Sequence, residues 1–129
     1  MSNYGYTKKV PMEFDEAIKK VKASLMEQGF GVLTEIDVKA TMKQKLGKDI
    51  DDYVILGACN PILAAKAIDA EIEIGLLLPC NVIIYKKNGD VFVSAIMPSV
   101  AMSFVKNDAL ADVAKVAEAK LSTSINNLS

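Results

Sequence analysis

The alternation of apolar and polar residues near the start of the chain predicts a strand, a helix and a second strand. From Tyr4 to Val10, aromatic and β-branched residues alternate with small or charged ones, which is typical of a strand that is wet on one face. Between Met12 and Gln28 apolar residues recur with helical spacing, as they do along one face of an amphipathic helix. Gly29 follows at the position where a helix commonly ends in a left-handed conformation. We therefore expect a helix that ends at Gly29 and leads directly into the next strand.

The segment from Phe30 to Val38 is the clearest predicted strand, because its residues alternate regularly along the segment. One predicted face carries Val32, Thr34, Ile36 and Val38, and the opposite face carries Leu33, Glu35 and Asp37. We interpret Glu35 and Asp37 as a solvated face, with ligand binding as the alternative. The lysine-rich piece from Lys39 to Leu46 then predicts two turns of helix before Gly47, followed by a charged surface loop.

The middle of the chain predicts a buried strand, a helix start and a region whose structure stays open. Residues Tyr53 to Ala58 form a continuous run of β-type residues, so we expect this strand to be buried on both faces. Asn60 is a favoured N-cap, and Pro61 suits the first helical position, where its missing N–H does no harm. The helix should continue to about Ala70. Residues 71–78 would then form a last helical turn, a loop or a short strand.

Asn88-Gly89 is the strongest hairpin signal in the chain, because this dipeptide favours the tight turn that joins two antiparallel strands. It lies between two β-type runs, residues 81–86 and 91–97. After a connection that includes a turn of helix, Asn107 caps a final amphipathic helix that extends to about Ile125.

This order of elements predicts a single α+β domain over residues 1–129. A hairpin with helices to one side favours a mostly antiparallel sheet, because strictly alternating parallel strands would leave no role for Asn88-Gly89. One face of the sheet would pack against the helices, and the other would need a partner. Since 51% of the residues are hydrophobic, we expect that partner to be a second copy of the chain, as in a homodimer.

The composition excludes several kinds of site. The chain has no His, and its 15 basic residues are all lysine. Without His there is no imidazole base, no Cys-His nucleophile pair and no imidazole metal ligand. Without Arg there is no planar fork for phosphate, and the net charge of −1 argues against electrostatic binding of nucleic acid. We therefore expect no nucleic-acid partner, no metal and no cofactor.

The start of the chain lacks the apolar core of a signal peptide, so we expect a cytoplasmic protein. The longest apolar run, from Ile74 to Ile84, is much shorter than a bilayer span, and we expect no membrane partner. In a reducing cytoplasm Cys59 and Cys80 should be free thiols rather than a disulfide.

Three separated motifs give the chain a resemblance to a known family. They are GFGVLTEIDV at residues 29–38, GACNP at residues 57–61 and LLLPCNV at residues 76–82. In this order they resemble the prokaryotic domain-of-unknown-function 302 family over nearly the whole chain. The resemblance implies a fold similar to the half-repeat of the TATA-binding protein, with a strand, a helix, four strands and a helix, usually as a homodimer. It implies no agreed activity, and likeness to a DNA-bending fold is no reason to expect DNA binding.

The positions that recur in that family include two acidic residues and both Cys-Asn motifs with their neighbouring prolines. The resemblance therefore implies these candidate ligand-binding residues: Cys59, Asn60, Pro61, Pro79, Cys80, Asn81, Glu35 and Asp37.

The two Cys-Asn sites allow two interpretations. Cys59 lies just before a predicted helix start, where unpaired backbone N–H groups favour a thiolate. If the sheet places Cys80 beside it, the two would form a dithiol pocket with two Asn amides nearby. The alternative is that both cysteines are small buried hydrophobes and that both asparagines cap or brace turns.

Two functional hypotheses follow. The preferred one is a non-catalytic homodimeric module with a pocket near the two Cys-Asn motifs that binds a small molecule or a protein, so no catalytic residue is assigned. The alternative is a thiol-dependent redox or sulfur-transfer enzyme with Cys59 as nucleophile and Cys80 as resolving thiol. Its only available base would be a carboxylate such as Glu35. A metal site is disfavoured, because two sulfurs per chain fall short of the four ligands that zinc usually takes.

Overall fold

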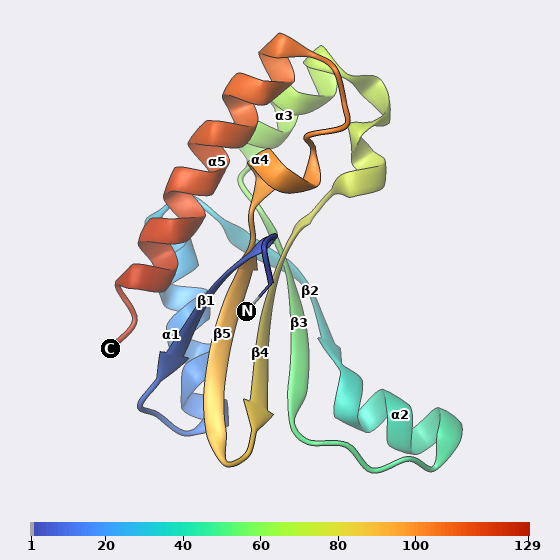
Figure 1. Ribbon diagram of the computed structural model, residues 1–129, viewed down its shortest axis with the longest axis vertical. Coiled ribbons are helices and arrows are strands. Elements are labelled where there is room, and N and C mark those ends of the chain that lie inside the picture. The colour runs from blue at the N-terminus through green and yellow to red at the C-terminus, as the bar shows by residue number, and fades with distance from the viewer. Residues whose placement is uncertain (1) are drawn as a thin grey trace.

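A five-stranded antiparallel sheet in the order β1-β5-β4-β3-β2 is the centre of the computed structural model, which describes residues 2–129 (Figure 1). The strands are β1 (Gly5–Val10), β2 (Gly31–Asp37), β3 (Tyr53–Cys59), β4 (Cys80–Lys87) and β5 (Asp90–Ile96). Every neighbouring pair is antiparallel. The predicted α+β class with a mostly antiparallel sheet is confirmed.

Most of the helices gather on one side of this sheet and beyond one of its ends, whereas a short helix follows β2 at the opposite end (Figure 1). They are α1 (Phe14–Glu27), α2 (Val38–Leu46), α3 (Pro61–Ala70), the 3-10 helix η1 (Ile72–Leu77), α4 (Pro98–Ala101) and α5 (Asp108–Asn126). The order is the implied strand, helix, four strands and helix, with the shorter helices inserted between them. None of the helices in residues 2–129 combines the length and apolar composition that crossing a membrane requires.

The turn and cap residues take the conformations that their types favour. Asn88 and Gly89 join β4 to β5 with positive φ angles of 53° and 84°, as the Asn-Gly hairpin signal predicts. Gly29 and Gly47 follow α1 and α2 with φ of 84° and 64°. Residues 71–78, whose structure stayed open, contain the 3-10 helix η1. The predicted elements are therefore confirmed, with boundaries that differ by one or two residues.

The predicted faces of β2 are wrong, because the strand contains a bulge. Its register shifts between Val32 and Thr34, so Val32 pairs with Ala58 while Thr34 pairs with Gly57, and Leu33 is the extra residue. The alternation is therefore reversed after the bulge. Glu35 lies on the helix side, where it forms an ion pair with Lys22 of α1 at 2.5 Å.

The prediction that β3 is buried on both faces is also wrong. On the helix face Val54, Leu56 and Ala58 are buried, whereas Tyr53 and Ile55 on the opposite face are only half-buried. The reason is that the described helices leave most of that face uncovered, so a continuous apolar run here does not mean burial on two sides.

Two separate clusters of buried side chains form the interior. The larger one lies between the sheet, α1 and the last turns of α5, with Leu25, Leu56 and Leu121 among its members. The smaller one lies beyond the end of the sheet, where Ile74 and Leu110 are the largest fully buried side chains. Helix α5 runs along both clusters (Figure 1). The two clusters leave space between them, and the candidate site is located there.

Candidate functional site

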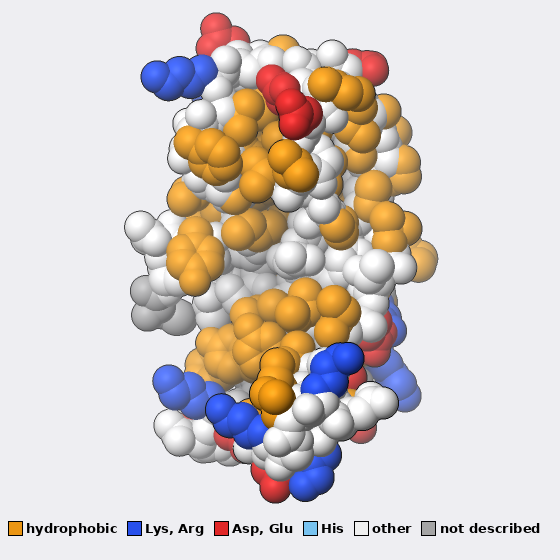
Figure 2. Space-filling model, turned by 90° about the vertical axis from the view of Figure 1, so that its right-hand side faces the viewer, with side chains coloured by type: hydrophobic (Ala, Val, Ile, Leu, Met, Phe, Trp, Pro, Cys, Tyr) orange, Lys and Arg blue, Asp and Glu red, His pale blue; other side chains and the backbone are white. Residues whose placement is uncertain are grey.

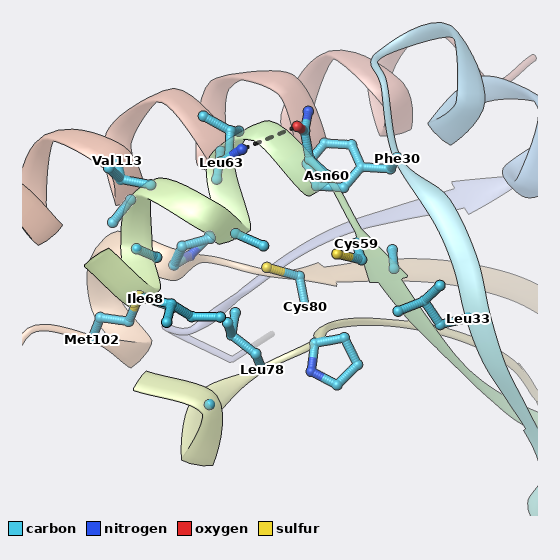
Figure 3. A pocket seen from close by; sticks show the side chains of 18 residues that line it. Phe30, Leu33, Cys59, Asn60, Leu63, Ile68, Leu78, Cys80, Met102 and Val113 are labelled. Atoms are coloured by element: carbon cyan, nitrogen blue, oxygen red, sulfur yellow. Dashed lines mark hydrogen bonds between the residues drawn. The ribbon is translucent and has the colours of Figure 1, made fainter. Parts of the chain in front are cut away.

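A cavity of about 300 Å³ lies between the two clusters, at the end of the sheet where β3 finishes and β4 begins (Figure 3). The sheet side of its wall consists of Phe30, Leu33, Ala58, Cys59 and Cys80. Leu33 is the bulge residue of β2, and the bulge brings its side chain to the cavity edge. Phe30 and Leu33 mark one end of the cavity, and Met102 and Val113 mark the other.

The opposite wall is formed by α3 and α5, which present mostly small side chains. Ala64 and Ala67 of α3 and Ala114 and Ala117 of α5 line the cavity. Alanine is a strong helix former, so these positions keep both helices regular while leaving space that larger residues would fill. Hence the cavity originates from the choice of small residues on two neighbouring helices.

A short helix completes the wall and is held by a half-buried carboxylate contact. The Glu118 carboxylate on α5 accepts hydrogen bonds from the Ser99 backbone N–H at 3.0 Å and from its hydroxyl at 2.6 Å. These bonds anchor α4, whose first residue Pro98 lines the cavity together with Met102. The end of the cavity near Met102 is therefore held in place by hydrogen bonds that lie outside the cavity.

The two cysteines lie side by side in the cavity wall as free thiols. Cys80 pairs with Ala58 in the sheet, so Cys59 is the next residue along the neighbouring strand. Cys80 is buried and Cys59 is half-buried. Burial first, and then the proximity of the Cys59 thiolate, raise the pKa of the Cys80 thiol from 9.0 to about 11. At neutral pH Cys80 is therefore an uncharged thiol and a poor nucleophile.

Asn60 is positioned by two hydrogen bonds to the backbone. Its Oδ1 accepts from the Leu63 N–H at 3.3 Å, which confirms the predicted N-cap of α3. Its Nδ2 donates to the Gln28 carbonyl at 3.4 Å, which links the start of α3 to the end of α1. The interpretation of Asn60 as a brace is therefore confirmed.

Within residues 2–129, no group of three or more His, Cys, Asp or Glu side chains is placed so that it could hold a metal ion.

The comparisons with known proteins agree with this fold over nearly its whole length. Residues 6–128 match the family model described as "Domain of unknown function DUF302". The chain belongs to the DUF302 family. The crystal structure of an uncharacterized conserved DUF302 protein from Bacillus stearothermophilus is 29% identical in sequence, with a TM-score of 0.91 over 97% of this chain and 98% of that one. The comparison with curated proteins found no match.

The structure divides the eight candidate residues of this DUF302 protein into two groups. Four of them line the cavity together, namely Cys59, Asn60, Pro79 and Cys80. The other four, Pro61, Asn81, Glu35 and Asp37, lie outside its wall. The position of each residue within its helix or strand explains whether its side chain reaches the cavity.

Asn81 follows Cys80 in β4, and neighbouring strand residues point to opposite faces. It is exposed and borders a hollow on the other face with Tyr53 and Ser94. Asp37 is the N-cap of α2, where its Oδ1 accepts from the Ala40 N–H at 2.9 Å. Glu35 is occupied by its ion pair with Lys22. The interpretation of these two acids as exposed surface groups agrees with the structure.

Most of the cavity wall could not be recognised from the Cys-Asn motifs. The lining residues outside those motifs come from the start of β2 and its bulge, from α3 and α5 and from the end of α4, and examples are Phe30, Leu33, Ile68 and Met102. The alanine-rich inner faces of α3 and α5 were the available signal. It is a weak one, since alanine also favours helices in general.

Proposed function

We propose that this DUF302 protein is a non-catalytic homodimeric module that binds a small ligand, or a small apolar part of a protein, in the cavity beside Cys59 and Cys80. The observation that carries the proposal is the cavity itself, about 300 Å³ of space that opens at the junction of two core clusters. Protein interiors are normally packed without such space, so a cavity that persists is a candidate binding site.

The absence of an activated group in the wall favours binding over catalysis. Among the described lining residues there is no carboxylate and no lysine. Burial keeps the Cys80 thiol protonated at neutral pH. A general base or an activated nucleophile would need a partner that this wall does not offer.

The homodimer is proposed through the sheet face opposite the helices. Two rows of apolar side chains cross this face: Ile36, Ile55 and Ile83 in one row, and Tyr53, Tyr85 and Phe92 in the other. The aromatic rings stack, with ring centroids 6.0 Å apart for Tyr53 and Tyr85 and 5.2 Å apart for Tyr85 and Phe92. A second copy of the chain would bury both rows through a two-fold axis.

The distribution of surface side chains agrees with this proposal. Figure 2 shows apolar side chains gathered in two groups on one side of the molecule, one in the lower half and one at the upper end. Large exposed apolar groups of this kind are uncommon on monomers and commonly mark interaction surfaces.

Ligand binding is tested by screening a fragment library of neutral and charged compounds for a rise in melting temperature. For compounds that raise it, amide NMR spectra should show the largest shifts at Cys59, Asn60 and Cys80. If no compound raises the melting temperature, or if the shifts fall outside the cavity wall, the binding proposal is wrong.

A second candidate function is thiol-dependent redox or sulfur-transfer chemistry, and the meeting of both thiols in one cavity favours it. In this reading Cys59 is the nucleophile, because it is the more exposed of the two. The test is the rate of iodoacetamide alkylation of Cys59 in a Cys80→Ala variant. A rate at pH 7 well above that of cysteine in an unstructured peptide would favour the enzyme, and a rate equal to it would favour simple binding.

A further inference from the structure

We infer that the cavity of this protein accepts an uncharged, apolar molecule of about the size of two fused six-membered rings. This inference rests on the proposed binding function and adds the chemical class of the ligand. It follows from the chemistry of the wall, from its size and from the way it opens to solvent.

The wall offers nothing that would compensate a charge. Among residues 2–129, no Lys, Asp or Glu side chain lines the cavity. A charged group moved from water into such a wall loses its hydration and gains no ion pair in return, so its transfer is unfavourable. A ligand with a carboxylate, phosphate or ammonium group inside the cavity is therefore disfavoured.

The few polar side chains in the wall are already occupied or uncharged. Both polar atoms of the Asn60 amide are directed at backbone groups of Leu63 and Gln28. The Cys80 thiol stays protonated, because burial raises its pKa to about 11. A thiol is a weak hydrogen-bond donor and is compatible with an apolar neighbour. Affinity would therefore come from burial of apolar surface rather than from directed polar contacts.

The volume of the cavity sets the size of the molecule. An engineered apolar cavity of about 150 Å³ in another protein stays dry and binds benzene. A cavity of about 300 Å³ is twice that size and fits a bicyclic ring system. Its elongated form, from Phe30 and Leu33 at one end to Met102 and Val113 at the other, matches such a molecule (Figure 3).

The edge of the cavity is apolar as well. Leu33 and Ile68 both line the cavity, and they remain 68% and 40% exposed. Exposed leucine and isoleucine side chains at an opening provide an apolar path from the surface to the interior. An uncharged molecule would thus meet apolar surface before it loses contact with solvent.

The experiment compares three naphthalene derivatives that differ mainly in charge: 2-methylnaphthalene, 2-naphthoate and 2-naphthylmethylammonium. Dissociation constants are measured by amide NMR titration of the whole chain. We expect 2-methylnaphthalene to bind, and each charged compound to bind at least about 100-fold more weakly. Equal or tighter binding of a charged compound in the cavity would overturn the inference and leave the proposed binding function intact. Failure of all three compounds, and of the fragment library, would overturn both.

Two pairs of variants locate the bound molecule. Ala64→Phe on α3 and Ala117→Leu on α5 fill the cavity from two sides, whereas Ala65→Phe and Ala119→Leu place the same groups at exposed positions on the same helices. We expect the two filling variants to weaken binding of 2-methylnaphthalene at least tenfold, and the two controls to leave it unchanged. If one filling variant fails to fold, the other still decides. Unchanged binding in a folded filling variant would place the molecule outside the cavity and overturn the inference.

Discussion

At the scale of single residues, the two cysteines differ in their surroundings although their motifs look alike. Cys80 is the first residue of β4 and is buried on the helix face, whereas Cys59 ends β3 and is half-buried. The asparagines that follow them differ in the same way, since Asn60 caps α3 and Asn81 lies exposed on the opposite face. The two Cys-Asn motifs therefore have different roles, because one lies at the start of a helix and the other at the start of a strand.

The raised pKa of Cys80 predicts a specific dependence of stability on pH. The folded protein binds the thiol proton more tightly than the unfolded chain, since the pKa is about 11 when folded against an ordinary 9.0. The resulting stabilisation is fully present below pH 9 and is lost as pH rises through about 11. The two values differ enough to lower the free energy of unfolding by at most about 3 kcal/mol over this range.

Urea denaturation of wild type and Cys80→Ala between pH 8 and 11 checks this prediction. Tyrosines and lysines also titrate in this range, so the informative quantity is the difference in free energy of unfolding between the two proteins. That difference should shrink as pH rises. A Cys59→Ala variant should retain most of the effect, because burial is the larger cause of the shift. A difference that does not change with pH would contradict a raised pKa.

The cap formed by Asn60 gives a second prediction at this scale. Asn60→Ala removes the acceptor of the Leu63 N–H and the donor to the Gln28 carbonyl. We expect the free energy of unfolding to fall by about 1–2 kcal/mol, as for other N-caps. Asn60→Asp keeps an oxygen for the cap and loses only the donor, so it should cost less. Chemical denaturation of the three proteins measures both steps, and equal losses would mean that the cap oxygen contributes nothing.

At the scale of elements, the sequence predicts the secondary structure of each segment better than it predicts which other elements the segment packs against. Asn60-Pro61, Asn88-Gly89 and Asn107 each carry a local signal, so helix starts and the hairpin were predicted correctly. The bulge in β2 has no such signal, because it depends on how Thr34 and Gly57 meet across two strands. The wall of the cavity depends on packing of α3 and α5, which are distant in sequence. Local chemistry determines elements, and contacts between elements determine the site.

The close packing of β2, β3 and the residue before β4 predicts that a single added methyl group destabilises the protein strongly. A Cβ added to Gly57 would lie 2.2 Å from Thr34 Oγ1 and 2.8 Å from Pro79 Cγ. We expect Gly57→Ala to lower the free energy of unfolding by about 1–3 kcal/mol, because the neighbours must shift. Gly31→Ala is the matched control in β2, since nothing lies within 4 Å of its added Cβ.

Thermal and urea denaturation of both variants gives the comparison. The double variant Gly57→Ala with Thr34→Ala should recover part of the loss, because it removes the closer of the two contacts and leaves that with Pro79. Equal stability of Gly57→Ala and Gly31→Ala would contradict the close packing of β2 and Pro79 on β3.

At the scale of the whole molecule, helices shield one face of the sheet, while the opposite face carries two apolar rows that lack such cover among the described residues. The row of Ile36, Ile55 and Ile83 continues into Ser94 of β5, and the aromatic row ends at Lys9 of β1. The apolar surface is thus concentrated on the β2, β3 and β4 side. A dimer that buries this side would leave the cavity entrance near Leu33 close to the boundary between the two copies.

The dimer is tested by placing a charge in the isoleucine row on β4, the central strand of the sheet. We expect Ile83→Lys to weaken dimerisation at least about tenfold, because the two-fold axis would bury two uncompensated lysines. Met26→Lys is the control, since Met26 is an apolar residue that is 72% exposed on α1, away from the sheet face. Sedimentation equilibrium at micromolar concentration measures all three proteins. A monomeric wild type would rule out the homodimer, and dissociation by Met26→Lys but not by Ile83→Lys would move the interface to the helices.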